Sequence, residues 1–361
     1  MLNDKLVRWF SRPSLDRGAN TVIGLPVTLI TDVGKVRNEN QDRVVAMRVN
    51  TTTLSSKPFA VVALVDGMGG MWNGSECAIR ALSAFLNALI RFRHKIPLER
   101  LELAADIANM ALYEISKGRG GATLSAVLFT SDQGAFTLNI GDSRIYAVVA
   151  GDKGEEVTRL TIDDSLEEIV GGNGKDLLQF VGMGVGLKPH VKVVPQNAKR
   201  ILVSSDGVHF IRHETLCDSL LYARDTNDVA EQLITLATWR GAPDNASLAV
   251  TSLPEFSKCL SENEETGIEI WDPYGALHIM WQKQEQEQVD PQRAEARLSG
   301  PSDVSPKNAL QPAVPFTRPK SSKKIGNPKV SKGLKNKSKS DLSPQLTIEI
   351  PSDANPGEGK K

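Results

Sequence analysis

Eight short segments rich in Val, Ile, Leu and Thr constrain the fold of this chain most strongly. They read PVTLIT, RVVAMRV, FAVVALV, ATLSAVLFT, AFTLNI, RIYAVVA, RILVSS and ASLAVTS, and lie between residues 25 and 253. Such runs, bounded by Gly, Asp or Asn, predict β-strands. Several follow one another with only short turns between them, which favours antiparallel sheets over βαβ units. Eight strands are too many for one modest open sheet, so we expect two stacked sheets.

Three other segments carry apolar residues at helical spacing. The first runs from Cys77 to about His94, the second from Leu101 to Ile115, and the third from about Asp228 to Arg240. This periodicity predicts amphipathic helices. We therefore expect an α+β protein whose antiparallel sheets are covered by helices.

The composition is that of an ordinary soluble protein. The 361 residues are 40% hydrophobic and 24% charged, and the formal net charge is zero. Cys77, Cys217 and Cys259 are widely spaced and form no CxxC pair, so they predict reduced thiols in a cytoplasmic protein rather than disulfides or a zinc site. The sequence contains neither a secretory signal at its start nor an apolar run of roughly 18 residues that could span a membrane.

The pattern changes along the chain and predicts four regions. Residues 1–24 are an N-terminal extension, 25–255 the main domain, 256–282 a linker with an apolar segment, and 283–361 a disordered tail. The apolar segment from Ile268 to Trp281 could either pack on its own domain or dock a partner.

The tail contains a basic stretch. Residues 318–339 carry Lys and Arg but no acidic residue, with Pro, Ser and Gly between them. Such a stretch could contact nucleic acid, anionic lipid or an acidic protein, and a solvated tail without a partner is an equally good interpretation.

Four aspartates stand at the ends of predicted strands. They are Asp66, Asp142, Asp206 and Asp244. A single Asp at such a place is usually a turn residue. If the four strand ends share one edge, however, their carboxylates converge and repel one another unless a cation binds. Oxygen ligands of this kind suit Mg²⁺ or Mn²⁺.

Two charged residues precede the second predicted strand. Arg37 and Asp42 lie in the segment TDVGKVRNENQDR. The guanidinium group of Arg suits bidentate binding of a phosphate or carboxylate. For an isolated Arg, a surface salt bridge is the commoner role.

The order of the motifs resembles that of the metal-dependent protein phosphatases of the PP2C (PPM) family in their bacterial form. The motifs are TDVGKVRNENQD, LVDGMGG, GATLSAVLF, NIGDSRIY, LTIDDS, LVSSDGV and DNASLAV, over about residues 25–253. The resemblance implies a four-layer α-β-β-α sandwich of two antiparallel sheets. It also implies a site for two Mn²⁺ or Mg²⁺ ions at one end of the sheets.

The resemblance assigns a role to each motif residue. Asp66 would bridge both ions, and the Gly67 carbonyl would bind the second. Asp206 and Asp244 would hold the first ion, and Asp142 a weaker third.

The remaining roles concern water and substrate. The resemblance implies that Asp42 contacts metal-bound water, that Arg37 holds the substrate phosphate, and that Asn245 braces the Asp244 loop. Water bridging two ions would attack the phosphorus of phosphoserine or phosphothreonine.

The sequence departs from the family pattern at several positions. Gln41 stands where many relatives have Glu, and Met71 and Trp72 follow the glycines where a His and small residues are frequent. Asp164 stands where relatives often have His, so a histidine general acid is not evident.

The leading interpretation is an active, monomeric phosphatase that acts on phosphorylated proteins, with a cognate Ser/Thr kinase as a candidate partner. The alternatives are a catalytically weak adaptor with the same fold that acts through its tail, and a phosphatase for small esters.

Overall fold

The computed structural model describes residues 2–50, 57–152, 154–171, 176–261 and 267–280. The predicted disordered tail, 283–361, and Trp281 lie outside the described residues. All eight predicted strands are present in the structure. The three predicted helices are confirmed as α2 (Gly74–Arg91), α3 (Pro97–Ser116) and α7 (Thr226–Trp239).

The strands form two antiparallel sheets, as predicted. The six-stranded sheet has the order β1 (Arg17–Thr21), β2 (Val27–Asp32), β11 (Ala246–Ser252), β10 (Ala198–Ser204), β7 (Arg144–Gly151) and β8 (Gly154–Arg159). The seven-stranded sheet has the order β13 (Gly275–Met280), β12 (Gly267–Asp272), β3 (Asp42–Asn50), β4 (Phe59–Asp66), β5 (Leu124–Thr130), β6 (Gly134–Ile140) and β9 (His190–Val193).

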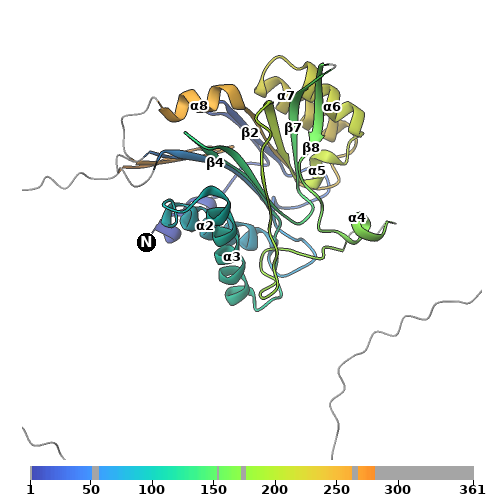
Figure 1. Cartoon of the computed structure of the whole chain (residues 1–361). Helices are drawn as coiled ribbons and strands as arrows, with labels where there is room; N and C mark the ends of the chain where they lie inside the picture. Colours follow the sequence, from blue (N-terminus) through green and yellow to red (C-terminus); the bar gives the residue numbers. More distant parts are fainter. Residues whose placement is uncertain (1, 51–56, 153, 172–175, 262–266, 281–361) are drawn as a thin grey trace, which may run out of the picture. The chain divides into compact units, whose positions relative to one another are not determined.

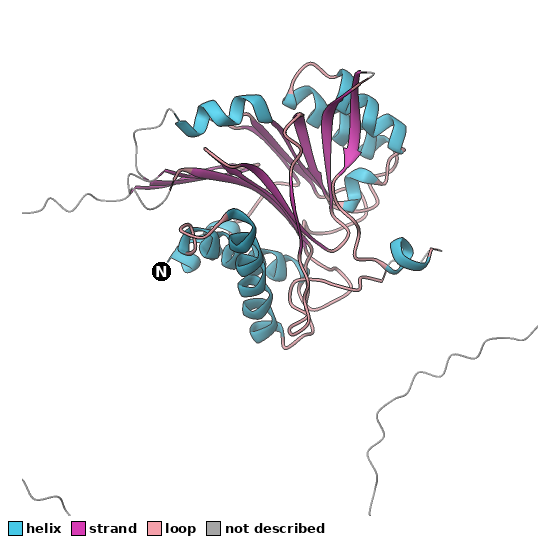
Figure 2. Ribbon diagram, in the orientation of Figure 1, coloured by secondary structure: helices cyan, strands magenta, loops and turns pink. Residues whose placement is uncertain are grey.

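Helices cover the outer face of each sheet, which gives the four layers α-β-β-α (Figures 1 and 2). The chain begins with α1 (Leu2–Phe10), which packs with α2 and α3 on the seven-stranded sheet. The remaining helices are α4 (Leu166–Val170), α5 (Asp206–His209), α6 (His213–Tyr222) and α8 (Leu253–Ser261). Of these, α5 and α6 pack with α7 on the six-stranded sheet.

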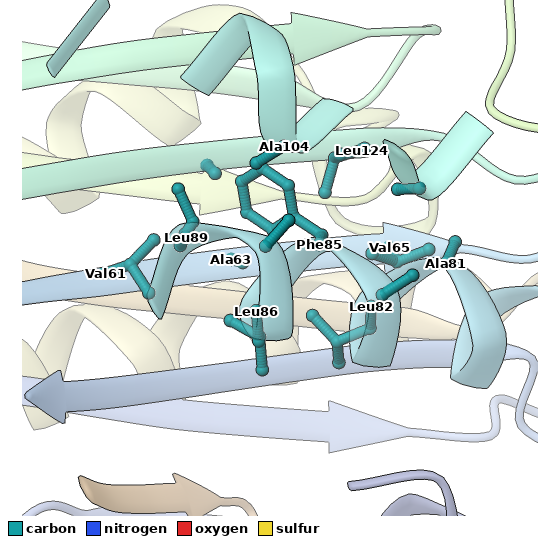
Figure 3. Packing of buried hydrophobic residues seen from close by; sticks show 14 of the residues in the cluster. Val61, Ala63, Val65, Ala81, Leu82, Phe85, Leu86, Leu89, Ala104 and Leu124 are labelled. Carbon is teal, nitrogen blue, oxygen red and sulfur yellow. The ribbon is translucent and has the colours of Figure 1, made fainter. Parts of the chain in front are cut away.

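The alternation of side chains along the central strands explains the layers. In β3, Val45 and Met47 belong to the core shared with α1, α2 and α3, whereas Val44 and Ala46 belong to the core between the sheets. Successive residues of a strand point to opposite faces, so a strand that is apolar throughout can be buried on both. Figure 3 shows the outer core, where Phe85 and other residues of α2 pack over β4.

The sheets extend beyond the range 25–255 that we expected for the main domain. Strand β1 lies before residue 25 and pairs with β2. After residue 255, β12 pairs with β3 and β13 pairs with β12, so the described part of the apolar segment packs on its own domain. The helix α8 replaces much of the expected linker, because Phe256 is buried against Phe129 with stacked rings. Among the described residues, the helices are all too short or too polar to cross a membrane.

The pairing of β12 with β3 predicts that the hairpin β12–β13 contributes to global stability. Ile270 on β12 is fully buried, so Ile270→Ala should reduce the free energy of unfolding by about 2–5 kcal/mol. Met280 on β13 is 73% exposed, and Met280→Ala should change the free energy of unfolding by less than about 0.5 kcal/mol. Urea unfolding measures both; equal effects would contradict the integration of β12 into the sheet.

Candidate active site

The predicted site residues come from both sheets. Asp66 ends β4 and pairs in register with Asp42, the first residue of β3. Asp244 lies two residues before β11 begins, and Asp142 lies in the turn between β6 and β7. We predicted Asp206 at the end of a strand, but β10 ends at Ser204 and Asp206 is the first residue of α5.

Strand pairing and hydrogen bonds bring the segments that carry these aspartates together. Asp42 lies opposite Asp66, and Ser205, which precedes Asp206, donates a hydrogen bond to Asp42. The pKa of Asp66 is raised well above its usual range, first by burial and then by the negative charges of Asp42, Asp206, Asp142 and Asp244. A carboxylate in such surroundings favours the neutral form unless a cation compensates the charge. The structure therefore brings together the acidic residues that the sequence analysis had singled out.

Asp42 is the most enclosed of these carboxylates, with 2% of its surface exposed. Its Oδ2 accepts a hydrogen bond of 2.9 Å from the Ser205 hydroxyl, but its Oδ1 is buried without a hydrogen-bond partner. Burial, followed by the charges of Asp206 and Asp244, raises the pKa of Asp42 to about 7, although hydrogen bonds from Ser205 and Ser247 oppose the shift. A buried oxygen without a partner is costly and indicates a site built for a further ligand.

Asp142 lies in the same charged environment. Burial, followed by the charges of Asp206 and Asp163, raises the pKa of Asp142 to about 6. The turn that carries Asp142 is held by Asp164, which accepts a hydrogen bond of 2.9 Å from the backbone N–H of Gly141.

Two glycines allow the loops of the site to approach closely. A Cβ atom on Gly67 would lie 2.1 Å from the carbonyl oxygen of Gly74, and one on Gly207 would lie 1.9 Å from that of Asn245. Neither position can therefore hold a larger residue without moving the backbone. Gly67 thus sets the end of β4 against the start of α2, and Gly207 sets α5 against the start of β11.

Asn245 connects the start of β11 to the loop that carries Arg37. Its Oδ1 accepts a hydrogen bond of 2.8 Å from the backbone N–H of Gln41. Its Nδ2 donates to the carbonyl oxygens of Val33 at 2.8 Å and Glu39 at 3.0 Å. We predicted a bracing role near Asp244, and these contacts show that Asn245 ties the segment 33–41 to β11.

Arg37 lies beside the carboxylates and forms an ion pair with one of them. Its Nη2 is 2.7 Å from Oδ2 of Asp244, and both side chains are partly exposed. The hydrogen bond to Asp244, with the charges of Asp66 and Asp206, raises the pKa of Arg37. In this arrangement Arg37 compensates part of the negative charge of the site.

Sequence reasoning missed two side-chain contacts of Asp164. Its Oδ1 lies 2.8 Å from Nε2 of His190 and accepts a hydrogen bond of 2.8 Å from Gln179. Together with the contact to Gly141, these bonds occupy both carboxylate oxygens and make Asp164 a support for the Asp142 turn. No sequence signal joins Asp164 to His190, because their contact depends on how β9 packs.

The donor atoms suit a hard divalent cation. They are carboxylate and carbonyl oxygens, the ligands that Mg²⁺ and Mn²⁺ prefer. Within the described ranges, however, no three Asp, Glu, His or Cys side chains are close enough together to form a complete ligand set. Asp244 instead pairs with Arg37 at 2.7 Å, and the buried Oδ1 of Asp42 has no hydrogen-bond partner, as expected of a site that takes a further polar ligand.

Comparisons with known proteins agree with the architecture and the motif order. The family model described as protein phosphatase 2C matches residues 36–249, which include every predicted site residue. The protein phosphatase PhpP of Streptococcus pneumoniae serotype 2 is 28% identical over 253 residues, covering 64% of this chain and 98% of PhpP.

Two further similarities extend this result. The serine/threonine protein phosphatase PstP of Mycobacterium tuberculosis is 27% identical over 255 residues, covering 63% of this chain and 44% of PstP. The PPM Ser-Thr phosphatase MsPP of Mycobacterium smegmatis, solved in complex with cacodylate, superposes with a TM-score of 0.51 at 24% identity, covering 63% of this chain and 97% of MsPP. At that identity the likeness to MsPP shows the fold alone.

Two buried aspartates predict opposite effects on the stability of the chain without metal. Asp42→Asn should raise the melting temperature in the presence of a chelator, because it removes a buried charge among other carboxylates. Asp163→Asn should destabilise the chain by about 3 kcal/mol, because Asp163 pairs with Arg144 at 2.6 Å. Thermal unfolding followed by circular dichroism measures both. A lower melting temperature for Asp42→Asn would show that the Asp42 carboxylate is a structural group.

Proposed function

The chain belongs to the protein phosphatase 2C family, and on that premise we propose that it hydrolyses phosphoserine and phosphothreonine in proteins with two bound Mn²⁺ or Mg²⁺ ions. The observation that carries this proposal is that Asp42 and Asp66 pair at the ends of β3 and β4, and that Ser205, next to Asp206 of the other sheet, donates a hydrogen bond to Asp42. A scaffold protein has no physical need to bury like charges together.

The proposed ligands are the ones that the resemblance to the family implies. Asp66, the Gly67 carbonyl, Asp206 and Asp244 would hold the two ions, and Asp142 a weaker third. When bound, such ions activate a water molecule for attack on phosphorus and neutralise charge on the phosphoryl oxygens.

Asp42 would act next to the ions rather than on them. Its Oδ2 is held by Ser205, whereas its buried Oδ1 is available as an acceptor. We assign to this oxygen the orientation of a water molecule in the site. The hydrogen bond from Ser205 restricts the carboxylate to one orientation, which is what a positioning role requires.

Arg37 would bind the substrate phosphate. Its guanidinium group is partly exposed and ends beside the carboxylates, and it can present two parallel N–H donors to phosphoryl oxygens. Because Arg37 pairs with Asp244 in this structure, binding of a cation by Asp244 would release Arg37 for the substrate. Cation binding by Asp244 and phosphate binding by Arg37 would then favour each other.

The leaving alkoxide requires a proton after the ester bond breaks. Asp164 stands where relatives often have His, but both of its oxygens are occupied by structural contacts. We therefore assign the protonation to solvent water.

Mn²⁺-dependent turnover tests the proposal directly. The chain should hydrolyse p-nitrophenyl phosphate and a phosphothreonine peptide only when Mn²⁺ or Mg²⁺ is present. Asp206→Asn should lower kcat/KM on the order of a thousandfold, because metal ligands contribute several kcal/mol to the transition state. The exposed Asp218 on α6 provides the control, and Asp218→Asn should keep full activity.

Folded protein without turnover at any Mn²⁺ concentration would favour the adaptor alternative, and a preference for the small ester would favour a small-ester phosphatase.

Substitution of Arg37 separates substrate binding from metal binding. Arg37→Met should raise KM for the phosphopeptide by roughly tenfold to a hundredfold, the contribution of charged hydrogen bonds to phosphate. It should not weaken Mn²⁺ activation, because it frees Asp244 from its ion pair. Titration of activity with Mn²⁺ and with peptide measures both constants. A Mn²⁺ requirement that rises in Arg37→Met would contradict the proposed role.

A further inference from the structure

A basic cavity lies at the end of the seven-stranded sheet that is remote from Asp66. It has a volume of about 220 Å³ and is formed by the connection between α2 and α3, the start of β4 and the turn between β5 and β6. Strand β4 begins at this cavity with Phe59 and ends at Asp66. At about 3.3 Å per residue, the two places are roughly 23 Å apart along the strand.

The charges around this cavity are mainly positive. Lys57, Arg93, Lys95 and Arg100 line it, and Asp132 is the one acidic residue among the described lining residues. Asp132 pairs with Lys57 at 2.6 Å, and Glu99, which is not a lining residue, pairs with Lys95 at 2.7 Å. In the described part of the chain, Arg93 and Arg100 form no ion pair. The lining therefore keeps an excess of positive charge.

Arg100 is the central observation. It is 3% exposed, and its guanidinium carbon lies 4.4 Å from the centroid of the Phe59 ring. Its Nε is buried without a hydrogen-bond partner, and within the described ranges its side chain forms no hydrogen bond or ion pair. Burial lowers the pKa of Arg100 to about 10, so the group remains charged at neutral pH. A buried cation without an anion is costly, and contact with an aromatic ring compensates only part of the cost.

The first turn of α3 borders the cavity and carries one acidic residue, Glu99, whose carboxylate pairs with Lys95 at 2.7 Å. The helix has 20 residues, and its N-cap residue, Ile96, offers no side-chain hydrogen bond to the first turn. Ile96 and Pro97 line the same cavity. Because Pro97 has no backbone N–H, this helix start contributes its partial positive charge to the cavity rather than a hydrogen-bond donor.

We propose that this cavity is a second phosphate-binding site, in which Arg100, together with Arg93 and Lys57, binds a phosphate group, free or esterified. The guanidinium group of Arg is well suited to phosphoryl oxygens. The site lies apart from the proposed active site, so phosphate can bind here without competing with the reaction. The inference does not rest on the proposed function, because it can be tested without metal.

Calorimetric titration of the full chain with inorganic phosphate in the presence of a chelator tests the site. The chelator and the Arg37→Met background together weaken phosphate binding at the proposed active site, and equal ionic strength with chloride controls for general charge effects. We expect saturable binding that Arg100→Met weakens roughly tenfold or more, because a charged hydrogen bond is lost. Met preserves much of the apolar contact with Phe59. Arg91 is exposed at the end of α2 and does not line the cavity, so Arg91→Met should leave the affinity unchanged.

Two further arms complete the experiment. If Arg100→Met does not fold, the double variant Arg93→Met/Lys57→Met replaces it in the experiment. Arg93 and Lys57 are exposed and line the cavity, so this variant should also weaken the binding of inorganic phosphate. A peptide with two phosphoserines that binds more tightly than inorganic phosphate, through Arg100, indicates an esterified ligand, whereas equal affinity indicates free phosphate. Absence of saturable binding by either probe, or equal binding by Arg100→Met and the parent, overturns the proposal and leaves Arg100 as a structural cation.

Discussion

The unfavourable burial of like charges at the paired ends of β3 and β4 is the constraint on which the rest of the site depends. Asp42 and Asp66 stand opposite each other in the antiparallel register, and further aspartates face them from the other sheet. Carboxylates in such a place cost free energy unless hydrogen bonds or cations compensate them. Ser205 supplies one hydrogen bond, Arg37 pairs with Asp244, and the remaining negative charge is what a divalent cation would neutralise.

The two sheets must pack together for this arrangement to exist. Asp42 and Asp66 belong to the seven-stranded sheet, whereas Asp206 and Asp244 follow or precede strands of the six-stranded sheet. The apolar core between the sheets therefore sets the separation of the acidic residues. Gly207 and Asn245 also affect this separation, because they hold α5 and the Arg37 loop against the start of β11. The packing of apolar side chains between the sheets thus determines where the charged groups of the site lie.

The sequence predicts the apolar strands and the acidic residues well but not their pairwise contacts. The eight predicted strands are runs of β-branched and aliphatic residues, whereas the unpredicted β8 reads GEEVTR and is mostly exposed, so its sequence carries little signal. The short β9 was missed for a similar reason, whereas α1 does have an amphipathic pattern, with Leu6 and Phe10 buried, that the sequence analysis did not use. The pairs Arg37–Asp244 and Asp164–His190 join distant segments, and only the tertiary structure brings them together.

The most direct test of the central claim is a diffraction experiment on crystals soaked in Mn²⁺, with data collected at the manganese absorption edge. The account predicts two anomalous peaks bound by Asp66, Asp206 and Asp244, with the Arg37–Asp244 ion pair broken. Absence of manganese at Asp66, with the carboxylates and Arg37 unchanged at saturating Mn²⁺, would contradict it.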